Sequence, residues 1–176
     1  MAEQFLTLMG DLDGDSQRRM AGWYGALREA GFVGTQTPGL PYHISLASFP
    51  PEKEREAVLS AEKAAAEFAP VPVHFSHMGL FAGGKVLFAA PENNPGLTTL
   101  HEACAADTEQ PGPWTPHATV LIDEPESVHA ALPVFVRSFA PFVGTIVRLH
   151  LCAFWPTREI VSAGLTGEFR PYSVSL

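Results

Sequence analysis

Short apolar segments alternate along the chain with longer segments in which apolar side chains recur at helical spacing. Residues 5–9 form an apolar run closed by Gly10, which predicts a strand, and the spacing that follows predicts a helix ending at Gly31. Residues 42–49 are β-rich and predict a second strand. Residues 52–68 are rich in alanine, glutamate and lysine and contain no glycine, so they predict a long helix.

The second half of the sequence shows the same order of elements. Gly83-Gly84 joins two strand-like segments and supplies the positive-φ turn of a β-hairpin. The segments predicted after residue 70 are strands at 71–80, 85–90, 117–122, 144–155 and 159–165, and helices at 97–106 and 125–139. Pro111-Gly112-Pro113 marks a loop. The order strand-helix-strand-helix-strand therefore occurs twice, with one strand left over.

This order is typical of an α+β protein, because strands in hairpins mix with helical crossovers. We interpret the chain as a single domain, residues 1–176, in which two degenerate repeats near residues 3–80 and 84–166 form two lobes. A cleft between two lobes is a usual place for a small ligand.

Composition narrows the classes of protein that fit. Of the 176 residues, 46% are hydrophobic and 17% are charged, which fits a globular core and excludes a disordered chain or a charge-rich coiled coil. The formal net charge of −8 disfavours a tight grip on long nucleic acid or on anionic membranes. The two cysteines lack CxxC spacing, which suits a reducing compartment, and the N-terminus has no basic region. We therefore expect a cytoplasmic monomer without a membrane anchor.

The pattern that carries chemistry is His-x-Ser/Thr, which occurs as His43-Ile44-Ser45, His74-Phe75-Ser76 and His117-Ala118-Thr119. On a strand this spacing puts the imidazole and the hydroxyl on the same face. The first and third occurrences hold equivalent places in the two repeats, each after a Pro/Gly loop with a proline just before the histidine. We therefore expect their two strands to lie side by side and to face one cavity, whereas the second occurrence is interpreted as structural.

Two histidines and two hydroxyls can cleave or form a phosphodiester through a ribose 2′-oxygen. One group must take a proton from the nucleophile and another must protonate the leaving oxygen, and histidine, with an ordinary pKa of ~6.5, can do both near neutral pH. The hydroxyls of Ser45 and Thr119 would donate hydrogen bonds to the non-bridging phosphate oxygens. This chemistry needs no metal, so we expect no cofactor.

At these residues the sequence resembles the 2H phosphoesterase superfamily, the 2′-5′ RNA ligase and cyclic phosphodiesterase group, whose signature is a pair of His-x-Thr/Ser-apolar motifs. Here they read His43-Ile44-Ser45-Leu46 and His117-Ala118-Thr119-Val120, and the resemblance covers essentially the whole chain. It implies a bilobal fold with two pseudo-symmetric lobes of antiparallel sheet, outer helices and a central cleft. It also implies metal-independent catalysis on substrates such as nucleoside 2′,3′-cyclic phosphates, ADP-ribose cyclic phosphate or 2′-5′-linked oligonucleotides. Members often have an arginine a few residues beyond the second motif, where this chain has Ile122-Asp123.

Other polar and aromatic residues are weaker candidates. Arg148 and His150 alternate with apolar neighbours on a predicted strand, which makes both candidates for substrate contact. His150 and Cys152 have a spacing that suits metal ligands, but two ligands are too few for a closed site. His101 and His129 lie on predicted helices and are expected to be solvated. A nucleobase could stack on an aromatic side chain near a strand end, for which the candidates are Tyr42, Trp114 and Trp155.

The hypothesis from the sequence is a metal-independent phosphoesterase that hydrolyses a 2′,3′-cyclic phosphate or a related small nucleotide diester. Its catalytic residues would be His43 and His117, and its phosphate-binding residues Ser45 and Thr119. The alternatives are a 2′-5′ RNA ligase or RNA end-processing enzyme, a non-catalytic nucleotide- or RNA-binding module on the same fold, and a metal-dependent phosphohydrolase. The expected partner is a small cyclic nucleotide or a short oligonucleotide, with long RNA bound weakly.

Overall fold

The strands and helices follow the predicted order. The computed structural model describes residues 4–92, 94–106 and 113–170. Its elements are β1 (Phe5–Leu12), α1 (Gly14–Glu29), β2 (His43–Phe49), a 3₁₀ turn (Pro51–Lys53), α2 (Glu54–Glu67), β3 (Val71–Leu80), β4 (Val86–Pro91), α3 (Pro95–Ala105), β5 (Ala118–Ile122), α4 (Pro125–Ser138), β6 (Phe142–Phe154) and β7 (Arg158–Gly164). Each predicted strand and helix is confirmed with small shifts at its ends, while Pro111 and Gly112 of the predicted loop lie outside the described residues.

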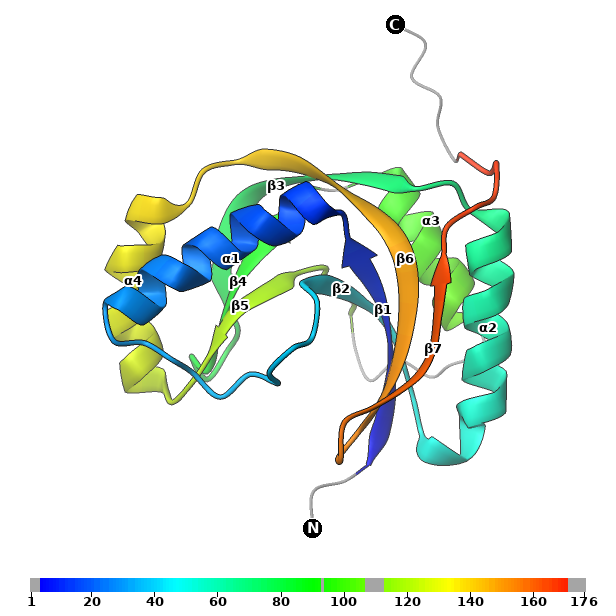
Figure 1. Ribbon diagram of the computed structural model, residues 1–176, viewed down its shortest axis with the longest axis horizontal. Coiled ribbons are helices and arrows are strands. Elements are labelled where there is room, and N and C mark those ends of the chain that lie inside the picture. The colour runs from blue at the N-terminus through cyan, green and yellow to red at the C-terminus, as the bar shows by residue number, and fades with distance from the viewer. Residues whose placement is uncertain (1–3, 93, 107–112, 171–176) are drawn as a thin grey trace, which may run out of the picture.

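The strands form one curved antiparallel sheet of seven, in the order β2-β1-β6-β3-β4-β5, with β7 paired to β6 (Figure 1). Exchanging β1 with β4, β2 with β5 and β3 with β6 gives the same order read from the other end. The centre of this pseudo-twofold symmetry is the pairing of β3 with β6, where Val73 lies opposite Gly144. The α+β class with two pseudo-symmetric lobes is thereby confirmed, whereas the exact bounds of the two repeats stay a prediction.

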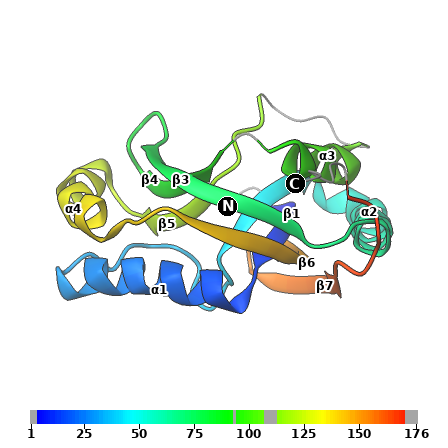
Figure 2. The same ribbon diagram turned by 90° about the horizontal axis from the view of Figure 1, so that it is seen from above.

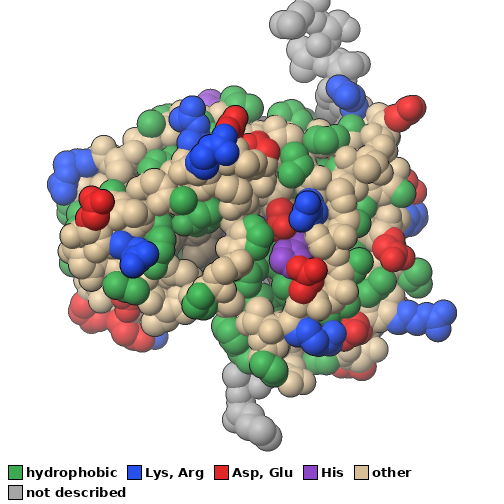
Figure 3. Space-filling view, in the orientation of Figure 1, with side chains coloured by type: hydrophobic (Ala, Val, Ile, Leu, Met, Phe, Trp, Pro, Cys, Tyr) green, Lys and Arg blue, Asp and Glu red, His purple; other side chains and the backbone are tan. Residues whose placement is uncertain are grey.

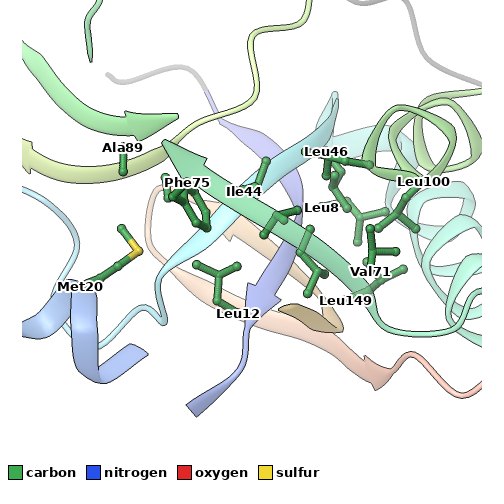
Figure 4. Packing of buried hydrophobic residues seen from close by; sticks show 14 of the residues in the cluster. Leu8, Leu12, Met20, Ile44, Leu46, Val71, Phe75, Ala89, Leu100 and Leu149 are labelled. Atoms are coloured by element: carbon green, nitrogen blue, oxygen red, sulfur yellow. The ribbon is translucent and has the colours of Figure 1, made fainter. Parts of the chain in front are cut away.

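Each lobe carries a pair of helices on its outer face. Helix α2 packs on α3 at one end of the molecule and α1 packs on α4 at the other, as the two views show (Figures 1 and 2). In the core, Leu46 of β2 lies near Leu100 of α3, and Phe75 of β3 points toward the side of Met20 on α1 (Figure 4). The outer faces are therefore apolar, and the inner faces are left for polar side chains. None of the described helices is long and apolar enough to cross a membrane.

Strand β1 runs through Gly10 to Leu12, so the prediction that it stops at this glycine is wrong. The glycine leaves room for core side chains, because a Cβ at this position would lie 2.9 Å from Cγ2 of Ile146 on β6 and 3.3 Å from Cδ1 of Leu46 on β2. The longer strand places Asp11 directly opposite His43 across the β1–β2 ladder. An acidic residue beside the first motif was thus missed.

The curl of the sheet brings its two ends together. Strands β2 and β5 stand at opposite ends of the strand order, yet they contact each other (Figure 1). Since β2 carries the first His-x-Ser/Thr motif and β5 the second, the two motifs meet as their equivalent places in the repeats predict.

Candidate active site

The first motif begins strand β2. His43 and Ser45 lie opposite Asp11 and Met9 of β1, on the inner face of the sheet. The Nδ1 atom of His43 is 2.7 Å from the carbonyl oxygen of Pro41. A carbonyl can only accept, so Nδ1 carries the hydrogen and Nε2 of the neutral ring is free to take a proton.

The second motif repeats this arrangement. The Nδ1 atom of His117, just before β5, is 2.8 Å from the carbonyl oxygen of Thr115, again two residues upstream. Its ring packs against Phe81 and Phe88, with centroid separations of 4.6 and 5.2 Å. Both histidines are therefore held by Nδ1 in the same tautomer, with Nε2 left for chemistry.

Side chains from the second half of the chain hold the open edge of β2. Trp114 donates a hydrogen bond from Nε1 to the carbonyl oxygen of Ser45 at 2.9 Å, and Nδ1 of His101 lies 2.6 Å from the carbonyl oxygen of Leu46. The two rings stack at a centroid separation of 3.9 Å. The prediction that His101 is solvated is therefore wrong, because its ring is hydrogen-bonded to a carbonyl at the edge of β2. His129 is exposed, as predicted.

A cavity of about 620 Å³ opens beside these motifs, and Figure 3 shows a hollow edged by hydrophobic side chains below α1. Of the four predicted catalytic and phosphate-binding residues, His43, Ser45 and Thr119 line it, and His117 lies outside the lining. Arg28 of α1 is the one lysine or arginine among the lining residues, which include no aspartate or glutamate from the described part of the chain. Sequence reasoning missed Arg28, because no spacing rule connects the last turn of a helix to a motif on another strand.

The loop from α1 to β2 forms one wall of the cavity. Its Thr35 donates from the backbone to the carbonyl oxygen of Ile122 at 2.6 Å, and Gln36 Oε1 accepts from the Ile122 amide at 3.2 Å. Gly34 has φ of +73°, and a Cβ there would lie 2.9 Å from the Ile122 carbonyl oxygen, so glycine is required. Near the other end of the loop, Gln17 bonds both the backbone amide and carbonyl of Tyr42 at 2.8 Å, immediately before the first motif. The wall is thus fixed to both motif strands.

Aromatic side chains form part of the cavity lining. Phe5 stacks on Phe154 at 5.4 Å, and Trp155 beside them is 47% exposed. Burial raises the pKa of Tyr42 to about 12, so this lining residue keeps its hydroxyl proton. Of the three predicted stacking candidates, Tyr42 and Trp155 therefore line the cavity, and Trp114 does not.

The protein environment lowers the pKa of both motif histidines. For His43 burial is the largest cause, opposed by the Pro41 carbonyl and by the charge of Asp11. Burial also lowers the pKa of His117, and the hydrogen bond to the Thr115 carbonyl opposes it. Both rings therefore favour the neutral form more than a free imidazole does.

The remaining candidates lie outside the cavity lining. Arg148 is exposed, opposite Asp11 on the β1–β6 ladder, and His150 is buried in ion pairs with Asp11 and Glu159. Cys152 Sγ lies 3.2 Å from His150 Nε2, but the described residues contain no group of three or more His, Cys, Asp or Glu side chains that could hold a metal ion. His74 of the second His-x-Ser occurrence pairs with Glu92 at 3.2 Å, away from the cavity lining.

Comparisons with known proteins agree with this geometry. The family model of the 2′-5′ RNA ligase superfamily matches residues 17–154. No curated protein sequence matches the chain significantly. Among solved structures, similar ones are a phosphoesterase (TM-score 0.64, 20% identity, 93% of this chain and 99% of that chain), E. coli LigT in apo form (0.63, 22%, 94% and 99%) and the protein TT0787 of Thermus thermophilus (0.64, 16%, 94% and 100%). At these identities the likeness to solved structures shows a shared fold.

Proposed function

The chain belongs to the 2′-5′ RNA ligase superfamily, and from this membership we propose that it hydrolyses a 2′,3′-cyclic phosphate or a related small nucleotide phosphodiester without a metal. The predicted resemblance to the 2H phosphoesterases is confirmed at the level of the family. The observation that carries the finer proposal is the matched pair of histidines, each held through Nδ1 by a carbonyl two residues upstream, on strands that contact each other.

The chemistry of this pair fits hydrolysis of a phosphodiester. A water molecule attacks phosphorus and gives a proton to one imidazole, while the bond from phosphorus to the leaving ribose oxygen breaks and that oxygen takes a proton from the other imidazole. Hydroxyl hydrogen bonds from Ser45 and Thr119 would stabilise the charge on the non-bridging oxygens. The reaction leaves a phosphomonoester, and both histidines return to their starting forms after one proton exchange with solvent.

The cavity supports a substrate of nucleotide size. A volume of about 620 Å³ falls within the ~300–1,000 Å³ range of small-molecule sites. Its aromatic lining suits a nucleobase, and Arg28 suits a further phosphate or another anionic group. Solved structures of E. coli LigT contain 3′-AMP in one case and ATP in another, which supports a nucleotide ligand here.

The test is a turnover screen with EDTA present throughout. We expect hydrolysis of at least one substrate among the four nucleoside 2′,3′-cyclic phosphates, ADP-ribose cyclic phosphate and a 2′-5′ dinucleotide. Binding without turnover would favour a non-catalytic module, and activity that EDTA abolishes would favour a metal-dependent phosphohydrolase. Joining of 2′,3′-cyclic phosphate and 5′-hydroxyl ends at rates above hydrolysis would favour the ligase alternative.

The pH dependence of kcat/KM should be bell-shaped. The rate falls at low pH, where the base becomes protonated, and at high pH, where the acid loses its proton. Since the pKa of both histidines is lowered, we expect the acidic limb below the ordinary imidazole value of about 6.5. Initial rates across pH 4–9 at constant ionic strength measure both limbs, and a rate that rises steadily with pH contradicts two-histidine catalysis.

Binding to long RNA should be weak and only slightly dependent on salt. The chain has a net charge of −8, and Arg158 is paired with Glu54. Within residues 4–92, 94–106 and 113–170, Arg28 is the one lysine or arginine that lines the cavity. With one or two phosphates neutralised, log K should fall with log salt at a slope of about −0.7 to −1.4. Fluorescence anisotropy with a 20-nucleotide RNA measures the slope, and Arg28→Gln should reduce it by about 0.7. Tight binding with a steep slope would instead indicate a polymer end as the substrate.

A further inference from the structure

A row of charged side chains crosses the inner face of the sheet from β7 through β6 and β1 toward the site. Glu159 Oε2 on β7 is 3.1 Å from Nε2 of His150 on β6, and His150 Nδ1 is 3.3 Å from Oδ2 of Asp11 on β1. Asp11 is in turn the cross-strand partner of His43 on β2, and residues paired in this way have Cβ atoms ~4.5–5.5 Å apart. The row therefore connects an exposed carboxylate to the first motif histidine, and Figure 3 shows a histidine among acidic and basic side chains over β6 and β7.

The middle of this row is buried and incompletely satisfied. Asp11 and His150 are each 6% exposed. Among the described residues, Asp11 Oδ1 has no hydrogen-bond partner, and the contact of His150 Nδ1 is the ion pair with Asp11 Oδ2. A buried ion pair is weak evidence for stability, because desolvation of the two charges offsets their attraction. The charge of Asp11 is also close enough to act on the neighbouring ring of His43.

The second motif has no such carboxylate beside it in the part of the chain that the structure describes. His117 packs between Phe81 and Phe88, and it is hydrogen-bonded to a backbone carbonyl. The two lobes, similar in fold, thus differ in the charge that they place beside their histidines.

Three charged or titratable side chains act on His43, namely Asp11 of β1, His150 of β6 and His117 at β5. Their effects differ in sign: beyond burial, which lowers the pKa of His43 most, the Asp11 carboxylate raises it and the charges of His117 and His150 lower it. The other charged or titratable side chains on the elements around the site are Arg148 of β6, Glu159 of β7, His101 of α3 and Arg28 of α1.

We propose that Asp11, which the ion pairs with His150 and from there to Glu159 hold in place, is a positioning residue. Its carboxylate stabilises His43 in the protonated form and thereby makes His43 the general acid and His117 the general base. This inference rests on the proposed function. In the hydrolysis, His117 Nε2 takes the proton of the attacking water as the new P–O bond forms. His43 Nε2 then gives its proton to the ribose oxygen that leaves phosphorus. A carboxylate beside an imidazolium favours the charged form, which the acid needs and the base does not.

The isosteric variant Asp11→Asn tests the proposal, because it removes the charge and keeps the shape. The acid must be protonated, so the high-pH limb of kcat/KM should move to lower pH by about one unit, with the low-pH limb unchanged. His150→Gln removes a cation near the same ring and should move the high-pH limb in the opposite direction. Glu92→Gln is the matched control, because it breaks a carboxylate–imidazole pair, that with His74, outside the cavity lining.

A role in packing alone would not move the high-pH limb in opposite directions in Asp11→Asn and His150→Gln. Unchanged limbs in both Asp11→Asn and His150→Gln overturn the inference, as does a shift of the low-pH limb alone in Asp11→Asn. NMR titration of ¹⁵N-labelled His43 measures its pKa without turnover, so failure of the inference can be distinguished from failure of the proposed function. If the wild type turns over no phosphodiester, the function fails, while a His43 pKa that falls in Asp11→Asn still supports the coupling and an equal pKa refutes it. Should Asp11→Asn not fold, His150→Gln decides by the sign of its shift.

Discussion

Replacing either His43 or His117 by alanine should lower kcat/KM for a cyclic phosphate by about 10²–10⁴-fold, the usual contribution of a positioned general acid or base. The double variant should lose less than the product of the two single losses, because the histidines act in one proton-transfer cycle. The measurement is the initial rate of phosphomonoester formation at the pH optimum. Each ring is hydrogen-bonded to a backbone carbonyl two residues upstream on its own segment and joins no side-chain hydrogen-bond network among the described residues, so we expect both variants to fold.

The matched control is His74→Ala. This histidine belongs to the remaining His-x-Ser occurrence, pairs with Glu92 and does not line the cavity, so its loss should leave the rate nearly unchanged. Circular dichroism spectra should overlay for the wild type and the three single variants. Full activity in either His43→Ala or His117→Ala would remove that histidine from the mechanism.

The elements of this fold were predictable because their signals are local. Helical spacing and a glycine-free segment identified α2, Gly83-Gly84 identified the β3–β4 hairpin, and the i, i+2 spacing put His43 and Ser45 on one face. The repeated order of elements also predicted that the two motifs meet. The pairing of β3 with β6 puts the two motif strands at equivalent places on either side of the pseudo-twofold axis, and the curl of the sheet then brings them into contact.

The missed residues depend on contacts between segments far apart in the sequence. The sequence predicts His101 as an exposed helix residue, because its partner, the carbonyl oxygen of Leu46 at the edge of β2, lies 55 residues away in the sequence. Arg28 reaches the cavity because the loop after α1 is tied to Ile122 of β5. Asp11 did have a local signal, since polar or pocket-facing side chains alternate with Leu6, Leu8 and Leu12 along β1, but treating Gly10 as the strand end hid it. Pairing and register, which no single-sequence pattern specifies, decide such cases.

The arginine that members of the family often carry after the second motif is replaced here by an apolar and an acidic residue. The cation nearest to that role is Arg28, which comes from the first repeat and from a helix, with its guanidinium 5.9 Å from the ring of Tyr24. Arg28 lies on a helix that contacts β5, whereas the family's arginine lies just after the second motif itself. If the proposed function holds, we expect this change to affect which substrate binds rather than the acid-base chemistry of the two histidines.

Removing one motif hydroxyl, by Ser45→Ala or Thr119→Val, should lower kcat by about 10²-fold, since a donor aimed at charge that develops in the transition state acts mainly on the chemical step. KM should change little, because the same hydrogen bond is weaker to the ground-state phosphate. Ser45→Thr keeps the hydroxyl at a half-buried position that lines the cavity, so it should retain most of the rate. Ser76→Ala, in the occurrence outside the cavity, is the control and should have no effect. A rise in KM with kcat unchanged in both hydroxyl variants would mean that these side chains bind substrate without stabilising the transition state, and the charge on the non-bridging oxygens would then have to be met by another group on the cavity wall.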